Sequence, residues 1–107
     1  MKLIIAIVNN DDSHSVLGEL SKNGFSATKL STSGGFLRAG NATLLIGANE
    51  EKVSEITDII RRCSSKRTQM VETSPSFSNE TFMAMPVEVT VGGATVFVLD
   101  VDQFFKL

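Results

Sequence analysis

The 107-residue sequence contains one cysteine and one histidine, and each scarcity argues against a class of site. Cys63 cannot form an internal disulfide and has no metal-ligand spacing around it, so we expect no structural zinc and a reducing, cytoplasmic setting. His14 lies beside Asp11 and Asp12, and no second imidazole exists to assist it. We therefore interpret His14 as a solvated residue and expect a protein that is not an enzyme.

An excess of either charge is also missing. Ten basic and twelve acidic residues give a net charge of −2, which provides no electrostatic footprint for nucleic-acid polymers or anionic membranes. The apolar run at residues 3–8 is short and is followed by Asp11 and Asp12, so it is interpreted as a buried strand and not as a signal peptide. Any bound anion must therefore be held by local contacts.

Length and composition predict one domain spanning residues 1–107. Hydrophobic residues make up 42% and charged residues 21% of the chain, which is ordinary for a globular domain. A chain of this size has a real core but a modest stability margin, so it gains from oligomerisation.

Hydrophobic periodicity predicts alternating strands and helices. Val16, Leu17 and Leu20 share a helical face after several possible N-caps, and a second apolar stripe runs from Val53 to Cys63. The expected elements are a strand at 3–8, a helix at 13–22, strands at 25–30 and 42–47, a helix from Asn49, a long flexible loop at 64–85, and a hairpin of strands 87–91 and 94–99 turning at Gly92-Gly93.

This order is that of an α+β, ferredoxin-like βαββαβ fold with a C-terminal hairpin extension and a long loop after the second helix. Both helices would cover one face of the sheet. Subunits packing together would cover the other face, so a symmetric oligomer is expected. Phe104 and Phe105 would then pack over a neighbouring subunit.

A glycine-rich loop between the second and third strands has the composition of a binding loop. Its glycines at 34, 35 and 40 permit close approach of the backbone to a ligand, Phe36 can stack, Arg38 can meet an anion and Asn41 can read a polar edge. The pattern favours a nucleotide-like anion. The alternative is that the glycines only shape a tight connection.

Three parts of the chain together carry a family resemblance: residues 3–8, residues 27–30 with 34–41, and residues 86–89 with 91–98. They resemble the PII-like cyclic di-AMP receptor proteins of Gram-positive bacteria. The resemblance covers most of the chain and is weakest in the long loop.

The resemblance implies a homotrimer that binds one cyclic di-AMP in each of three clefts between subunits, without a cofactor, and signals by loop rearrangement to a downstream protein that the sequence does not identify. It also implies that the ligand contacts fall on Thr28, Gly35, Phe36, Leu37, Asn41, Gly47 and Phe97. Asn41 would pair with adenine, Thr28 would donate its hydroxyl, Gly47 would leave room and Phe97 would form an aromatic wall.

The second strand departs from the family pattern. Gly24 and Ser26 stand where the family usually has asparagine and arginine, which removes a charge-assisted phosphate contact of about 1.5–3 kcal/mol. Arg38, Lys29, a basic residue of the long loop or backbone N–H groups near Gly34-Gly35 can replace it.

Two other functions stay open. A PII-like receptor for ATP or ADP is favoured by the missing arginine, and a trimeric protein-interaction module would bind no nucleotide. An acylphosphatase shares the topology, but it needs an arginine-containing phosphate loop where residues 9–12 are Asn-Asn-Asp-Asp.

Overall fold

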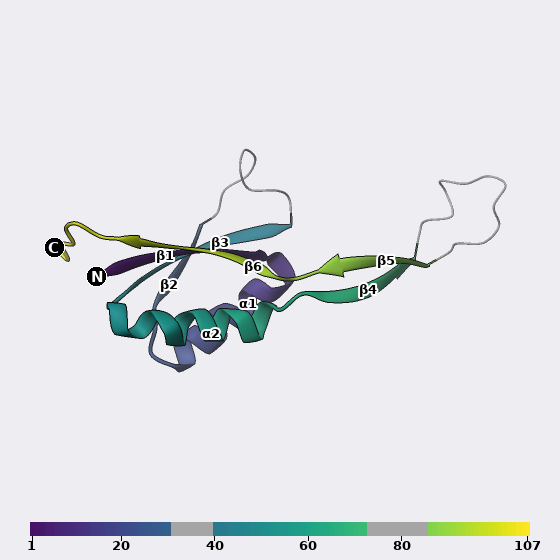
Figure 1. Cartoon of the computed structure of the whole chain (residues 1–107), viewed down its shortest axis with the longest axis horizontal. Helices are drawn as coiled ribbons and strands as arrows, with labels where there is room; N and C mark the ends of the chain where they lie inside the picture. The colour runs from purple at the N-terminus through teal and green to yellow at the C-terminus, as the bar shows by residue number, and fades with distance from the viewer. Residues whose placement is uncertain (31–39, 73–85) are drawn as a thin grey trace.

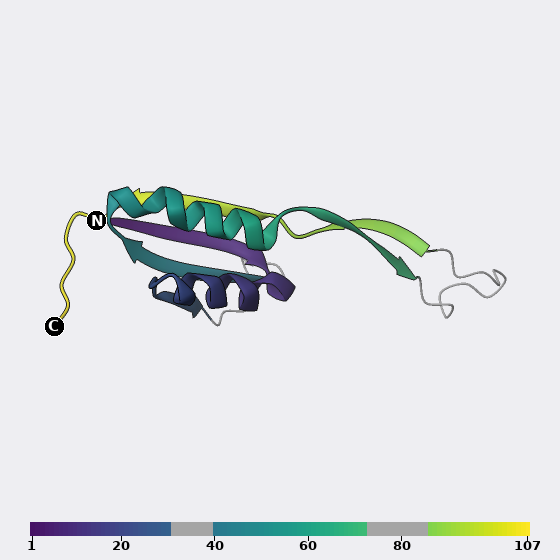
Figure 2. The same ribbon diagram turned by 90° about the horizontal axis from the view of Figure 1, so that it is seen from below.

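The structure is a computed structural model that describes residues 1–30, 40–72 and 86–107. Four antiparallel strands form a sheet in the order β2-β3-β1-β6, and helices α1 and α2 lie together on one of its faces (Figures 1 and 2). This arrangement confirms the predicted α+β ferredoxin-like fold. The elements are β1 (Lys2–Asn9), α1 (Asn10–Lys22), β2 (Ala27–Leu30), β3 (Asn41–Ala48), the 3-10 turn η1 (Glu50–Lys52), α2 (Val53–Ser64), β4 (Arg67–Glu72), β5 (Pro86–Val91) and β6 (Ala94–Asp100).

The core lies between the sheet and the two helices. Alternate residues of β1 (Ile4, Ala6 and Val8) are buried on the helix side, as the period-2 geometry of a strand requires. They meet aliphatic side chains of β3 and of both helices, namely Leu44, Ile46, Val16, Leu20, Ile56, Ile59 and Ile60. The predicted apolar stripes of the helices are therefore confirmed as core faces.

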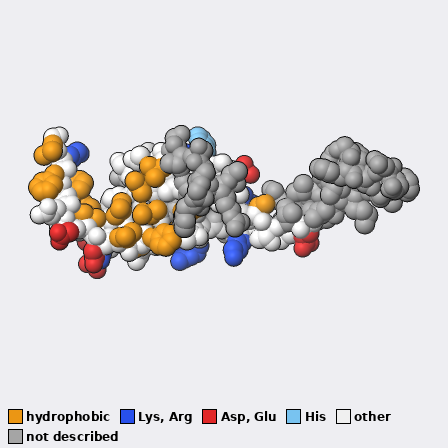
Figure 3. Space-filling view, turned by 90° about the horizontal axis from the view of Figure 1, so that it is seen from above, with side chains coloured by type: hydrophobic (Ala, Val, Ile, Leu, Met, Phe, Trp, Pro, Cys, Tyr) orange, Lys and Arg blue, Asp and Glu red, His pale blue; other side chains and the backbone are white. Residues whose placement is uncertain are grey.

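The opposite face of the sheet, which we call the open face, is covered by neither helix. By strand alternation it carries Leu3 and Ile5 of β1, Leu45 of β3, and Phe97 and Leu99 of β6. Phe97 and Leu99 remain 46% and 45% exposed. Figure 3 looks onto the sheet from this side and shows hydrophobic side chains gathered over it. Such a patch on a small domain indicates an interaction surface.

Two predicted element starts are corrected. Helix α1 begins at Asn10 and not at Ser13, because the Asn9 side chain accepts a hydrogen bond from the Asp11 N–H at 2.8 Å and so caps the helix earlier. Strand β2 begins at Ala27 and not at residue 25, because the Phe25 N–H donates to the Leu20 carbonyl at 2.9 Å and still belongs to the helix end.

The predicted hairpin of residues 87–91 with 94–99 is wrong. Strand β6 pairs with β1 along its whole length, whereas β5 pairs with β4 in a separate two-stranded ribbon. Gly92 and Gly93, both at φ near +85°, join β5 to β6 without reversing the chain direction (Figure 1). Hydrogen bonding to the central strand β1 decides the partner of β6, so β5 needs a different one.

The partner of β5 is a strand in the first part of the segment predicted as a loop, residues 64–85, so this part of the prediction is wrong. Residues Arg67–Glu72 form β4, in a register that places Arg67 opposite Val91 and Glu72 opposite Pro86. The sequence lacked a strand signal here because this segment carries few apolar residues among its Ser- and Thr-rich neighbours. The rest of the predicted loop, residues 73–85, lies outside the described residues.

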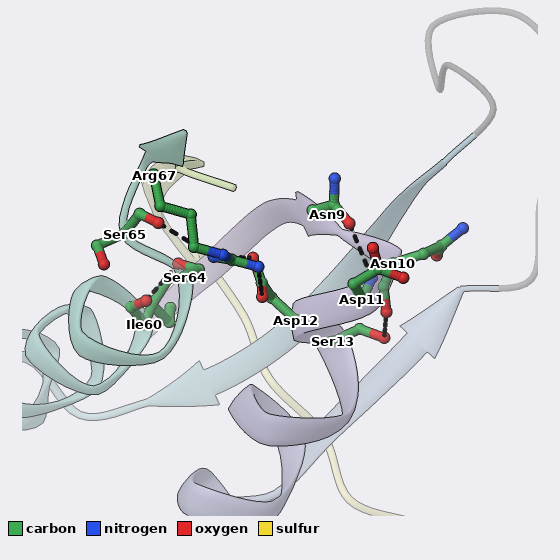
Figure 4. A network of polar contacts seen from close by, with 9 residues as sticks. All are labelled: Asn9, Asn10, Asp11, Asp12, Ser13, Ile60, Ser64, Ser65 and Arg67. Carbon is green, nitrogen blue, oxygen red and sulfur yellow. Dashed lines mark hydrogen bonds and ion pairs between the residues drawn. The ribbon is translucent and has the colours of Figure 1, made fainter. Parts of the chain in front are cut away.

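The β4–β5 ribbon is fastened to the main body at its base. Arg67 Nη2 donates to Asp12 Oδ1 at 2.7 Å, and Arg67 Nη1 donates to Asp12 Oδ2 at 3.3 Å and to the Ser65 carbonyl at 3.2 Å (Figure 4). The Gly93 N–H donates to the Ser64 carbonyl. Asp12 is only 6% exposed, so this pair joins the first turn of α1 to the ribbon through a buried carboxylate. In the described part of the chain, no helix is long and apolar enough to span a membrane.

Candidate functional site

A cavity of about 570 Å³ lies on the open face, at the end of the sheet where β1 begins and β6 ends. Its lining includes Ser26 and Thr28 on the β2 side and Leu45 and Gly47 of β3. Thr28 is the cross-strand neighbour of Leu45, which places its exposed side chain on the open face. We call this the open-face cavity. Its volume is within the range of small-molecule sites, about 300–1,000 Å³.

Gly47 leaves space at the floor of this cavity. It lies opposite Leu3, and a Cβ added to it would meet only Met1 Sδ, at 3.9 Å. The φ of Gly47 is also ordinary. Neither the backbone conformation nor packing within the subunit therefore requires glycine here, and the free volume above it is available to a ligand.

Phe97 lies on the same face as Thr28 and Gly47 but outside the lining of the open-face cavity. It is opposite Ile5 of β1, and β1 separates β6 from β3. Two strand spacings amount to about 10 Å. The Phe97 ring is therefore exposed beside the cavity and does not close it.

Asn41 lies at the opposite end of β3, where it faces Asn9. It lies six positions from Gly47, which corresponds to about 20 Å along the strand. It lines a smaller cavity of about 260 Å³ together with Asn9, Lys66 and Gly92, which we call the junction cavity. The structure thus brings Thr28 and Gly47 together but not Asn41 with them.

Three predicted contacts, Gly35, Phe36 and Leu37, lie outside the described residues, as does Arg38. Of the other basic residues proposed to replace the missing arginine, Lys29 lies on the helix side of the sheet and donates to Ser13 Oγ at 3.5 Å. Lys66 lines the junction cavity, away from Ser26.

The sequence interpretation missed the contribution of the C-terminal segment. Val101, Phe104 and Lys106 line the open-face cavity from this segment, and the Val101 N–H donates to the Met1 carbonyl at 3.2 Å. The segment carried one usable signal, its two adjacent phenylalanines, which are 61% and 70% exposed in the chain. One of the two, Phe104, lines the cavity.

An ion pair stands at the rim of the same cavity. Lys2 donates to Asp100, its partner across β1 and β6. This hydrogen bond raises the pKa of the Lys2 amine and lowers the pKa of the Asp100 carboxyl. Both groups therefore stay charged over a wide pH range, and the positive charge of Lys2 is already balanced.

Two further findings concern a third cavity and possible metal ligands. A third cavity, about 470 Å³, lies between α2 and β6 and is lined by Ile60, Arg61 and Val96 among others, with no predicted contact in its lining. Over the stretches of chain that the structure describes, no three His, Cys, Asp or Glu side chains come together as metal ligands.

Comparison with known proteins agrees with this architecture. A crystal structure of a functionally unknown protein from Pediococcus pentosaceus ATCC 25745 is similar, with 42% sequence identity and a TM-score of 0.76, over 99% of this chain and 96% of that chain. The family model described as cyclic-di-AMP receptor matches residues 1–107. With a match over its whole length, the chain belongs to the cyclic-di-AMP receptor family.

Proposed function

We propose that this protein is a cytoplasmic receptor that binds cyclic di-AMP in clefts between the subunits of a homotrimer. The observation that carries the proposal is the open-face cavity, in which Thr28 and Gly47 lie together on a sheet face that neither helix covers. Thr28 offers a hydroxyl donor, and Leu3 and Leu45 offer apolar surface for a base.

The placement of Asn41 supports a site shared between subunits. About 20 Å separates Asn41 from Gly47 within one chain, so the two cannot hold the same adenine from one subunit. If two subunits meet on their open faces, the Asn41 end of one chain can complete the Gly47 end of another. Gly35, Phe36 and Leu37 would join the site from the loop that precedes Asn41.

Signalling by binding, without catalysis, is the mode of action we propose. The only histidine, His14, is exposed on α1, on the other side of the sheet from the cavity. The β4–β5 ribbon projects away from the sheet (Figure 1) and offers an unidentified downstream protein a surface of its own. Ligand binding would act on that surface through the loops.

Isothermal titration calorimetry with cyclic di-AMP, together with light scattering of the same sample, tests this proposal. We expect saturable binding near one ligand per chain and the mass of three chains. Absence of heat and of any thermal shift would overturn the receptor function, since a ligand at 100 times its Kd stabilises a protein by about 2.7 kcal/mol.

ATP or ADP is a second candidate ligand. The missing strand-two arginine keeps this alternative open, because Ser26 lines the cavity where the family resemblance places a residue that contacts cyclic di-AMP. Competition between ATP and cyclic di-AMP separates the two: displacement of cyclic di-AMP by equimolar ATP would favour this second candidate.

A further inference from the structure

The open-face cavity has an unusual charge balance for a site that holds a dianion. Cyclic di-AMP carries two phosphodiesters, and the β2 side of the cavity offers them only the neutral hydroxyls of Ser26 and Thr28. A phosphate held by hydroxyls alone lacks the charge-assisted hydrogen bonds that are roughly twice as strong as neutral ones. A cation from another element is therefore needed.

Two lysines line the cavity, and they differ in whether their amine already forms an ion pair. The Lys2 amine is engaged with Asp100 across the β1–β6 pair, as described above. Lys106 is exposed and forms no ion pair with any residue that the structure describes. The Lys106 amine can therefore bind a ligand phosphate without breaking an existing ion pair.

The basic residues elsewhere are placed for other tasks. Lys29 points to the helix side and contacts Ser13, and Arg67 is bound to Asp12 at the base of the ribbon. Lys66 lines the junction cavity at the far end of β3, so within one chain it does not reach Ser26. Within the described chain, the C-terminal segment is thus the source of an available cation next to Ser26.

The fold holds this segment near the cavity. Strand β6 ends at Asp100, and the hydrogen bond from the Val101 N–H to the Met1 carbonyl directs the following residues past the start of β1. Both termini accordingly lie at the same end of the sheet (Figures 1 and 2). Phe104 contributes apolar surface to the same cavity, and Lys106, two residues later, also lines it.

We propose that Lys106 neutralises a ligand phosphodiester over Ser26 and Thr28, in place of a cation on β2. This inference rests on the proposed function, because it assigns the phosphate contact of the same site. On this proposal the C-terminal segment is part of the ligand site. Lys106, which lies outside the strands and helices, then contributes to the binding affinity.

Calorimetric titration of Lys106→Met with cyclic di-AMP tests the inference, with Lys29→Met as the matched control. Loss of one charge-assisted contact weakens binding by about ten- to a hundredfold, whereas Lys29→Met leaves the Kd within about twofold. The dependence of log Kd on log salt concentration also becomes shallower for Lys106→Met. The melting temperature of the unliganded variant stays that of the wild type, since Lys106 is exposed.

A second variant separates charge from shape. In the Lys106→Met background, Ser26→Arg restores a cation beside the same phosphate, and we expect it to recover at least tenfold of the lost affinity. An unchanged Kd for Lys106→Met overturns the inference and leaves the receptor function intact. A double variant no tighter than Lys106→Met overturns the electrostatic role. Failure of the wild-type protein to bind cyclic di-AMP overturns the proposed function itself.

Discussion

Arg67 and Asp12 lie 55 positions apart in the chain and form a bidentate ion pair, with N···O distances of 2.7 and 3.3 Å. The carboxylate belongs to the first turn of α1 and the guanidinium to the first residue of β4. The hydrogen bond to Asp12 raises the pKa of Arg67 above its ordinary value, so the pairing favours the charged guanidinium. The pair is therefore a charge-assisted clasp between the ribbon and the main body.

Removal of this clasp should destabilise the protein more than loss of a surface ion pair. Arg67→Met leaves the buried carboxylate of Asp12 without its partner, whereas Arg62→Met only breaks an exposed contact with Asp58 on α2. Urea unfolding should show a clearly lower free energy of unfolding for Arg67→Met than for Arg62→Met. Equal values for the two variants would contradict the structural role of the pair.

Two effects favour glycine at position 92, a positive φ and the close approach of neighbouring atoms. Gly24 shares the first effect but not the second, so it serves as a comparison. Both residues have φ of +84°, so alanine at either position costs about 1–2 kcal/mol of backbone strain. A Cβ at Gly92 would also lie 2.6 Å from the Ser65 carbonyl oxygen and 2.6 Å from Arg67 Nη1, while a Cβ at Gly24 meets nothing within 4 Å.

Thermal or urea unfolding should therefore rank Gly92→Ala as the more damaging variant, by at least about 1 kcal/mol, because overpacking adds to the strain. If Gly24→Ala cost as much as Gly92→Ala, the close approach at the ribbon base would have no energetic consequence.

Gly47→Ala should affect the ligand without affecting the fold. The added methyl group meets only Met1 Sδ in the subunit but takes volume from the open-face cavity, so we expect cyclic di-AMP binding to weaken by about tenfold or more. The melting temperature should not fall. Gly18→Ala on the exposed surface of α1 is the control and should bind as the wild type does; unchanged binding by Gly47→Ala would remove Gly47 from the site.

The open face predicts how the subunits of the proposed trimer associate. Leu99 and Val98 are adjacent on β6 and both are 45% exposed, but Leu99 lies opposite Leu3 on the open face and Val98 lies opposite Ile4 on the helix side. Light scattering should show that Leu99→Asp converts trimers to monomers while Val98→Asp leaves trimers. Persistence of trimers in both variants would place the subunit interface elsewhere.

The Lys2–Asp100 pair predicts a defined pH dependence of stability. Because the folded pKa of Asp100 is lowered, its contribution is present above the ordinary aspartate pKa of about 4 and is lost as pH falls through the folded value. Because the folded pKa of Lys2 is raised, the contribution is complete below the ordinary lysine pKa of about 10.4 and is lost as pH rises through the folded value.

Urea unfolding of wild type and Lys2→Met at pH 3, 7 and 11 measures this contribution. The stability difference between the two proteins should be largest at pH 7 and should shrink at both extremes. A difference that does not change with pH would mean that Lys2 stabilises the fold by packing alone.

The sequence predicted those parts of the fold that depend on local periodicity. Alternation in β1 and the apolar stripe of α2 each report burial directly, and both were interpreted correctly. Helix starts were off by a few residues, because Asn9 and several residues after it are all acceptable N-caps and only one of them is used.

Strand partners could not be predicted in the same way. Gly92-Gly93 is typical of a hairpin turn, and only the competition of β1 for β6 shows that these glycines join two different sheets. The same holds for the site. Thr28 and Gly47 followed from a motif, but the approach of Lys106 to Ser26 depends on where the chain runs after β6, and no local pattern encodes that path.

The ribbon has a consequence for how this protein opens. Two strands without a core of their own are marginally stable in water, so β4 and β5 depend on their attachment at Arg67 and Gly93. The four-stranded sheet, by contrast, is held by a buried aliphatic core. The molecule therefore has two levels of stability, and the ribbon can separate and re-form many times within the lifetime of a single folded sheet.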